Sequence, residues 1–283
     1  MSERDLAFQR VAILGLGVMG GSLARALSAL PRGPAVLGWS PNATEANAAL
    51  TAGALDEVSP SPEAAVEGAD LVVLAAPLDA CLSLMERLAP HLVGGRTLTD
   101  VASLKEPLAR AATTLGLGDR WVGSHPMCGS ADSGFASSRR DLFEDARVWL
   151  CAPEEARDHV PAVRRFWVSL GAVTAPIDAG DHDRLMALVS HLPQLTANAL
   201  AATLEAAGVE PGEMGPGGRD MTRLAGSSPG VWRDILARAP MELPGHLRST
   251  ADRLLDLAAL VEKGDVDALV RWLSESHAWR TGA

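Results

Sequence analysis

A glycine-rich turn near the N-terminus constrains the fold more than any other part of the chain. The apolar residues 11–14 lead directly into the run Gly15-Leu16-Gly17-Val18-Met19-Gly20, and apolar residues then recur at helical spacing up to residue 30. This order of strand, glycine turn and helix is typical of a dinucleotide-binding unit. The glycines allow a tight turn, close approach to a pyrophosphate and close packing of the helix on the strand, while the helix N-terminus offers free N–H groups to the phosphates.

The end of the next strand should indicate which dinucleotide is bound. An acidic side chain there, about 20 residues past the glycines, would bond the adenosine ribose hydroxyls and select NAD. Ser40 occupies this place, directly after a strand predicted at 35–39. Without a carboxylate nothing repels the 2′-phosphate of NADP, yet no arginine follows to bind it. The cofactor is therefore NAD or NADP, and Ser40 alone slightly favours NADP.

Strands and helices alternate through the first half of the chain, which predicts a parallel sheet with helical crossovers. Further strands are predicted at 70–77, 97–101, 121–123, 147–150 and 172–174. Ser103 and His125 each follow one of these strands, and ligands bind beyond the carboxyl ends of parallel strands. Both are therefore candidates to face the nicotinamide. Ser103 could instead cap a helix predicted at 105–115, and His125 could be a turn histidine bonded to backbone.

The strand signal stops after Pro176, and the remaining pattern is helical. A helix that opens at residues 181–183 is apolar on more than one face, which predicts that it is buried. Pro193 removes one backbone hydrogen bond and should bend this helix. His191 lies at the bend, either as part of a site or as a core histidine. His182 is predicted to be a solvated surface residue.

Two arginines in the second half are spaced to share a helix face. Arg219 and Arg223 stand at i and i+4, with Asp220 between them. In an acidic chain such a pair indicates a carboxylate-binding pocket, and a plain solvated face is the alternative. The chain closes with helices predicted from Ser228 onward, and their apolar stripes are either a dimerisation surface or internal core.

This pattern predicts an α/β protein with two domains. A chain of 283 residues, of which 47% are hydrophobic, has material for two ordinary cores. We place a Rossmann-like dinucleotide-binding domain at residues 1–177 and an all-helical domain for substrate binding and dimerisation at residues 178–283.

Composition excludes several classes of partner. The net charge of −10 argues against nucleic acid or an anionic membrane. No window approaches the ~20 apolar residues of a membrane helix, and no apolar run follows the polar N-terminus as in a signal peptide. The cysteines, Cys81, Cys128 and Cys151, lack the spacing of a metal or disulfide site. We expect reduced thiols, no metal and a cytoplasmic location.

Five segments, in this order and at this spacing, resemble the prephenate/arogenate dehydrogenases of tyrosine biosynthesis along nearly the whole chain. They are residues 15–22, 100–105 (DVASLK), 123–130 (GSHPMCGS), 182–193 and 219–225. The resemblance implies an enzyme that oxidatively decarboxylates a cyclohexadienol, with hydride passing to a nicotinamide and CO₂ leaving the opposite ring carbon. Prephenate is the expected substrate and arogenate the alternative. The resemblance also implies a homodimer built by the helical domain.

The same resemblance implies roles for individual residues. His125 would take the hydroxyl proton, which suits a side chain whose ordinary pKa of ~6.5 leaves it largely neutral near pH 7. Ser103 would bond the same hydroxyl or orient the nicotinamide. The catalytic residues are then His125 and Ser103; the substrate-binding residues His191, Arg223, Asp220, Ser130 and Asp132; and the cofactor-binding residues Gly15, Gly17, Val18, Met19, Gly20, Ser40, Ala76 and Pro77. Arg223, held by Asp220, would anchor the substrate carboxylate, and His191 would contact the substrate side chain.

The chain departs from some members of the family shortly after the histidine, where it has Ala131 and Asp132. An inward Asp132 could pair with the ammonium of arogenate, whereas an outward one better suits prephenate. No fused chorismate mutase or regulatory domain is expected.

Two other functions compete with the dehydrogenase. A related hydroxyacid or imine oxidoreductase would place a catalytic lysine in the helical domain, where the only lysine is Lys263, at a helix end. A non-catalytic NAD(P)-binding regulator would not need Ser103, His125, His191 and Arg223 together.

Overall fold

The chain divides into two compact units. The computed structural model describes residues 7–130 and 132–282. The first unit contains the described residues up to Leu185 together with Gly226–Ala239, and the second contains Met186–Ala225 and the residues from Pro240 onward. The domain boundary expected after residue 177 stays a prediction.

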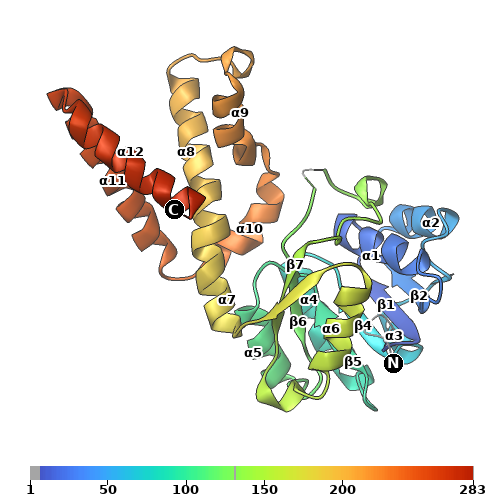
Figure 1. The fold of residues 1–283 in the computed structure, drawn as a ribbon. Helices are drawn as coiled ribbons and strands as arrows, with labels where there is room; N and C mark the ends of the chain where they lie inside the picture. The colour runs from blue at the N-terminus through green and yellow to red at the C-terminus, as the bar shows by residue number, and fades with distance from the viewer. Residues whose placement is uncertain (1–6, 131, 283) are drawn as a thin grey trace. The chain divides into compact units, whose positions relative to one another are not determined.

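The first unit is built on a five-stranded parallel sheet with the order β3-β2-β1-β4-β5 (Figure 1). The strands are β1 Arg10–Leu14, β2 Ala35–Trp39, β3 Glu57–Val58, β4 Leu71–Leu74 and β5 Thr97–Asp100. β4 is fully buried and apolar, and β1 is buried after its first residue, as strands with both faces covered must be. This topology confirms the Rossmann-like α/β fold.

Helices cover both faces of this sheet. They are α1 Val18–Ser28, α2 Ala43–Thr51, α3 Pro62–Glu67, α4 Leu78–Leu88 and α5 Glu106–Thr114. α1 and α2 contribute to one buried cluster, together with Ile13 of β1. α3, α4 and α5 contribute to the other, together with Leu14. Because successive side chains of a strand point to opposite faces, these neighbours anchor helices on the two sides of the sheet.

A smaller sheet follows and carries the central histidine. It contains β6 Gly123–Pro126, β7 Arg147–Cys151 and β8 Val173–Pro176, and α6 Val160–Ser169 precedes β8. Just before β6, the N–H of Val122 donates to the carbonyl oxygen of Leu98 in β5, at 2.9 Å. The chain then pairs antiparallel with β7, which places His125 opposite Trp149. His125 therefore lies within a strand and not beyond its end, because pairing with β7 extends the predicted strand 121–123 as far as Pro126.

Two further helices belong wholly or largely to the first unit. They are α7 Ala179–Met186, whose residues up to Leu185 lie in this unit, and α10 Pro229–Ala237. Arg238, the residue after α10, forms an ion pair with Asp79 of α4. This contact and the packing of α10 on α4 explain why a late segment of the chain groups with the sheet.

The second unit is helical. It contains a π-helical turn Ala187–His191, α8 Leu192–Ala206, α9 Pro216–Thr222, α11 Leu243–Lys263 and α12 Val266–Thr281. The irregularity predicted near Pro193 is thus a π turn, in which the backbone pairing widens just before the proline. Leu188 and Val189 of this turn are 45% and 52% exposed, so the expectation that this helix is buried is wrong for the single chain. The apolar pattern of this turn therefore marks a face that the single chain leaves open.

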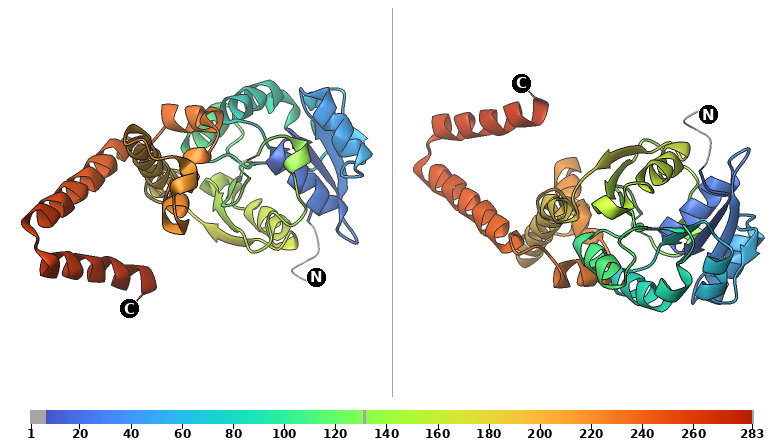
Figure 2. Two further views of the ribbon diagram at one scale, coloured as in Figure 1. Left: turned by 90° about the horizontal axis from the view of Figure 1, so that it is seen from above. Right: turned by 90° about the horizontal axis from the view of Figure 1, so that it is seen from below.

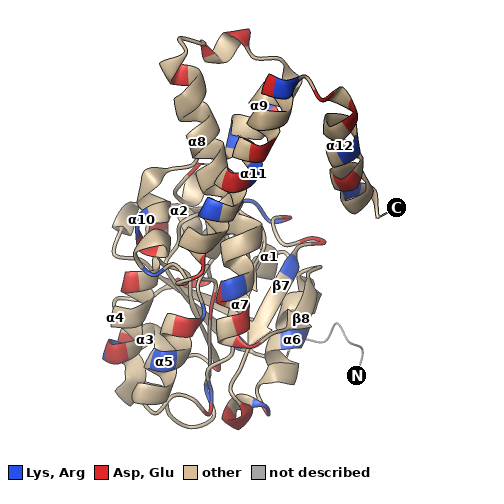
Figure 3. Cartoon of the chain, turned by 90° about the vertical axis from the view of Figure 1, so that its left-hand side faces the viewer, with Lys and Arg blue, Asp and Glu red and all other residues tan. Residues whose placement is uncertain are grey.

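The last two helices diverge from one turn. Figure 2 shows α11 and α12 diverging from the short turn that joins them. This turn consists of Gly264 and Asp265, and Gly264 has the left-handed φ of +66°. Charged residues of both signs alternate along the two helices (Figure 3). Both helices also expose large apolar side chains, namely Leu254, Leu255, Val261, Val266, Val270, Leu273 and Trp279. Among the described helices, none is long and apolar enough to cross a membrane.

The glycine turn offers a matched pair of variants. A Cβ on Gly20 would lie 1.9 Å from the carbonyl oxygen of Gly15, whereas a Cβ on Gly17 would meet nothing within 4 Å. We expect Gly20→Ala to lower the free energy of unfolding by about 1–3 kcal/mol or more. Gly17→Ala should change it by less than about 1 kcal/mol, yet weaken dinucleotide binding, because its methyl group occupies the space that the pyrophosphate approaches.

Urea unfolding and cofactor titration of both variants test this expectation. Equal stability of the two variants, or unchanged dinucleotide binding by Gly17→Ala, would contradict it.

Candidate active site

A cavity of about 520 Å³ opens at the carboxyl ends of β1, β2 and β4. Five of the predicted cofactor residues line it, namely Gly15, Gly17, Ser40, Ala76 and Pro77. The other three, Val18, Met19 and Gly20, are not among its lining residues and form the first turn of α1. The lining lies entirely within the first unit.

The backbone of this cavity fits a dinucleotide. Gly15 has φ +104°, and a Cβ there would lie 2.3 Å from the carbonyl oxygen of Ala75. Gly17 is the N-cap of α1 and leaves the first N–H groups of that helix without a side-chain cap. Such a bare helix N-terminus beside open glycine backbone is suited to a pyrophosphate.

Two charged residues in the cavity were missed by reasoning from the sequence. Glu45 of α2 lies beside Ser40, whose hydroxyl donates to Glu45 Oε2 at 3.4 Å. Arg87 of α4 also lines the cavity, and it donates from both Nε and Nη2 to the carboxylate of Glu63. These bonds lower the pKa of Glu63 to about 2. An acid in the first turn of the helix after β2 was the available signal, since Asn42 caps that helix.

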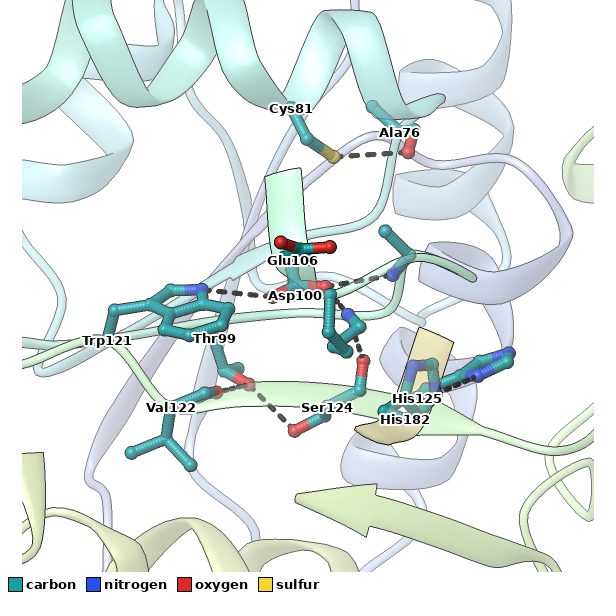
Figure 4. A network of polar contacts seen from close by, with 12 residues as sticks. Ala76, Cys81, Thr99, Asp100, Glu106, Trp121, Val122, Ser124, His125 and His182 are labelled. Atoms are coloured by element: carbon teal, nitrogen blue, oxygen red, sulfur yellow. Dashed lines mark hydrogen bonds and ion pairs between the residues drawn. The ribbon is translucent and has the colours of Figure 1, made fainter. Parts of the chain in front are cut away.

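A buried ion pair lies under the loop that carries Ser103. Asp100 (Figure 4), at the end of β5, binds the ammonium of Lys105. Both side chains are completely buried. Asp100 also accepts from Ala102 N–H at 3.0 Å and Trp121 Nε1–H at 3.1 Å. Burial raises the pKa of Asp100, and the ammonium and the other donors oppose that rise. Because Asp100 and Lys105 are the first and last residues of the loop 100–105, the ion pair holds the two ends of this loop together.

The same network anchors the strand that holds His125. Lys105 Nζ donates to the carbonyl oxygen of Ser124 at 2.8 Å. The Ser124 hydroxyl is bonded to Thr99 Oγ1 and accepts from Trp167 Nε1–H, each at 2.9 Å. The residue before His125 is thus fixed through both its backbone and its side chain, which limits the positions open to the imidazole.

His125 is the outer member of a hydrogen-bonded chain. Its Nδ1 lies 2.9 Å from Nε2 of His182, and His182 Nδ1 lies 2.7 Å from Oδ1 of Asp183. The Asp183 carboxylate in turn accepts the backbone N–H groups of Lys105 and Glu106, at 2.8 and 2.9 Å, at the start of α5. Figure 4 shows the two imidazoles side by side.

The prediction that His182 is a solvated surface residue is wrong. His182 is completely buried. Its neighbour Asp183 binds the N-terminus of α5, where the positive end of the helix dipole favours a carboxylate, and this contact draws the first turn of α7 inward. The adjacent His and Asp were a visible signal, but the N–H groups that Asp183 binds at the start of α5 lie 78 and 77 residues earlier in the chain.

The hydrogen bonds define which nitrogen of His125 is basic. An ionised carboxylate only accepts, so His182 Nδ1 carries the proton and His182 Nε2 is the acceptor. His125 must then donate from Nδ1, so Nε2 is the acceptor nitrogen of its ring. His125 is half-buried.

The remaining predicted residues of the first unit lie near these elements. Ser103 is half-buried between β5 and α5, and it does not cap α5, whose first N–H groups bond to Asp183. Ser130 and Asp132 are exposed, and the Ser130 hydroxyl accepts the N–H of Asp132 at 3.1 Å. Ala131 lies outside the described residues.

The second unit holds the other predicted residues. His191 is buried at the end of the π turn, 1% exposed. Arg219 lies in α9, and Arg223 directly follows the last residue of α9 and begins a 3₁₀ turn. Arg219 donates to the carbonyl of Met214. Within the described part of the chain, no ion pair joins Asp220 to Arg223, and both are exposed.

The cysteines and possible metal ligands add no further site. Cys81, Cys128 and Cys151 are free, and burial raises the pKa of all three thiols. Across residues 7–130 and 132–282, no group of His, Cys, Asp and Glu is arranged to hold a metal ion.

Known protein families match this chain in two adjoining segments that correspond to a nucleotide-binding domain and a dimerization domain. Residues 23–175 match the family of prephenate dehydrogenase nucleotide-binding domains, and residues 178–275 match that of prephenate dehydrogenase dimerization domains. Prephenate dehydrogenase of Bacillus subtilis is 30% identical over 96% of this chain and 75% of its own length.

Two solved structures are similar throughout. The prephenate dehydrogenase of Aquifex aeolicus, in complex with hydroxyphenyl propionate and NAD⁺, is 31% identical with a TM-score of 0.88, covering 98% of this chain and 99% of the other. The arogenate dehydrogenase of Synechocystis is 27% identical with a TM-score of 0.81, covering 96% and 98%.

The buried ion pair should be measurable as stability. Lys105→Met leaves Asp100 buried without its cation, and we expect a loss of about 3–5 kcal/mol in the free energy of unfolding near pH 7. Burial raises the pKa of Asp100 in the folded protein above its pKa in the unfolded chain. The ionised carboxylate therefore costs stability at pH values above these pKa values, and the cost is relieved as the pH falls and Asp100 binds a proton. The deficit of the variant should therefore shrink toward pH 4.

Arg110→Ala is the matched control, because it breaks only the exposed pair with Glu106. Its expected loss is at most about 0.5 kcal/mol at any of these pH values. Urea unfolding at several pH values measures both variants. A Lys105→Met deficit as small as that of the control would refute the role given to the buried pair.

Proposed function

The chain belongs to the prephenate dehydrogenase family, and on that premise we propose that it oxidatively decarboxylates prephenate to 4-hydroxyphenylpyruvate with NAD or NADP, in tyrosine biosynthesis. One observation carries the proposal: a half-buried histidine, hydrogen-bonded through His182 to Asp183, lies in the same unit as a glycine cradle for a dinucleotide. The Aquifex relative with NAD⁺ and an aromatic acid supports it. Arogenate is the second candidate substrate, supported by the Synechocystis relative.

The cofactor, when bound, supplies the acceptor for the hydride that leaves the hydroxyl-bearing ring carbon. Gly15 and Gly17 would hold its pyrophosphate against the start of α1. His125 Nε2 accepts the hydroxyl proton as the carbonyl forms, and it can return this proton to the phenol oxygen once CO₂ has left. The positive charge that His125 gains is stabilised through His182 by the Asp183 carboxylate.

The other residues have supporting roles in this proposal. Ser103 orients the substrate hydroxyl or the nicotinamide, from a loop that the buried ion pair holds in place. Arg223 binds the substrate carboxylate, and the exposure of its guanidinium in the single chain leaves it available for an anion. His191 and Ser130 contact the substrate. The exposure of Asp132 favours prephenate over arogenate, which would need an inward carboxylate for its ammonium.

The cofactor is more specifically NAD. Ser40 alone favours NADP slightly, but the Glu45 carboxylate beside it supplies the negative charge that is missing from the strand end. This charge would repel a 2′-phosphate.

A homodimer is the proposed assembly. The dimerization-domain match covers residues 178–275, and α11 and α12 expose a series of large apolar side chains in the single chain. A second copy of the chain that covers these side chains would remove them from water.

Replacing the proposed base tests the function directly. Wild-type protein should reduce NAD when mixed with prephenate, and His125→Asn should lower kcat by a factor on the order of 10² or more. NAD binding should be retained, because His125 is not among the residues that line the dinucleotide cavity. Absorbance of the reduced cofactor gives the rate, and repeating the assay with arogenate compares the two substrates. Near-normal turnover by His125→Asn would rule out this residue as the base.

The hydrogen-bonded chain behind His125 predicts a second effect. In Asp183→Asn an amide N–H can face His182, which reverses the proton positions and costs His125 Nε2 its lone pair. We expect kcat to fall on the order of 10²-fold with little change in KM for prephenate.

Thermal unfolding of the Asp183 variant controls for the loss of its contacts to α5. A rise in KM with unchanged kcat would show that Asp183 binds substrate and does not set the state of His125.

A further inference from the structure

The end of β2 lacks the acid that usually binds the adenosine ribose, but the cavity does not lack a carboxylate. Ser40 follows β2 directly, and its hydroxyl oxygen accepts the N–H of Asn42 at 3.2 Å. That bond turns the hydroxyl toward Glu45, to which it donates at 3.4 Å. Glu45 and Ser40 both line the cavity, at the carboxyl end of β2.

We propose that Glu45, from the first turn of α2, is the residue that makes this site select NAD over NADP. The inference rests on the proposed function only in taking the ligand to be a nicotinamide dinucleotide. Glu45 accepts a ribose hydroxyl as an acid at the strand end would, and Ser40 holds it in place. A 2′-phosphate, which carries a charge of about −1.5 to −2, would meet this carboxylate instead of a free cation.

The arginine that lines the cavity is already paired with a carboxylate. Arg87 is the one Lys or Arg among the described residues that line the cavity. Its guanidinium is bound by Glu63, with Nη2 at 2.9 Å from the carboxylate and Nε also donating. Glu63 stays ionised far below neutral pH, since these bonds lower its pKa to about 2. The Glu63 carboxylate therefore offsets the positive charge that Arg87 would present to a 2′-phosphate.

Cofactor binding without substrate tests the proposal. The dissociation constants of NAD and NADP are measured by calorimetry on the full chain, for wild type and for Glu45→Gln. Wild type should bind NAD at least about 10-fold more tightly than NADP. Glu45→Gln removes the charge but keeps the shape, so NAD binding should weaken, NADP binding should strengthen, and the ratio of the two constants should fall about 10-fold or more.

Glu86→Gln is the matched control. Glu86 is exposed on α4 next to Arg87, yet it does not line the cavity. This variant removes the same charge and should leave the ratio within about 2-fold of wild type. Wild type that prefers NADP, or Glu45→Gln with the wild-type ratio, overturns the proposal, and so does an equal change in Glu86→Gln.

The binding readout separates this proposal from the catalytic one. A protein that binds NAD selectively but turns over neither prephenate nor arogenate would contradict the proposed function and leave the role of Glu45 supported. Turnover of prephenate with equal use of NAD and NADP would do the reverse.

Discussion

Lys105 makes the interactions on which the proposed active site depends. Its ammonium binds Asp100 at the end of the parallel sheet and the Ser124 carbonyl in β6, and its backbone N–H binds Asp183. One residue thus connects the main sheet, the strand of His125 and the hydrogen-bonded chain behind that histidine. Removing two charges from water is costly unless each finds several partners, and here every partner is also an element of the site. The same contacts of Lys105 therefore stabilise the loop 100–105 and hold the strand of His125 in place.

The arrangement behind His125 follows from what a carboxylate can accept. Asp183 takes two backbone N–H groups from α5 and one ring N–H from His182. The two backbone bonds fix the carboxylate, and the third fixes the proton on His182. The state of His125 is thereby set from the N-terminus of a helix that contributes no side chain to the base itself. A single imidazole on the same strand could rotate or change tautomer, whereas this one is constrained at each step.

Local signals in the sequence predicted the elements well, and contacts between distant segments were the part it could not predict. The glycine turn at 15–20 and the apolar runs identified the parallel sheet, because both depend on residues that adjoin in the chain. The burial of His182 could not be inferred, because it depends on Asp183 meeting α5. The extension of β6 to Pro126 depends likewise on pairing with β7. The hydrophobicity of residues 185–195 predicted burial correctly for His191 but not for Val189, because the single chain leaves that side of the turn open.

The cofactor cavity shows why reading one position gives a weak argument about charge. Ser40 stands where an acid selects NAD, and its neutrality pointed slightly to NADP. What a phosphate would experience, however, is the sum of the charges around it, since electrostatic interactions in a partly enclosed cavity extend over several ångströms. Glu45 adds a negative charge beside Ser40, and the positive charge of Arg87 is balanced by Glu63. In our proposal, Glu45 of the first turn of α2 has the role that an acid at the strand end would have. The useful criterion is therefore the net charge that the folded cavity presents to the ribose, to which Glu45 adds a negative charge that position 40 alone does not reveal.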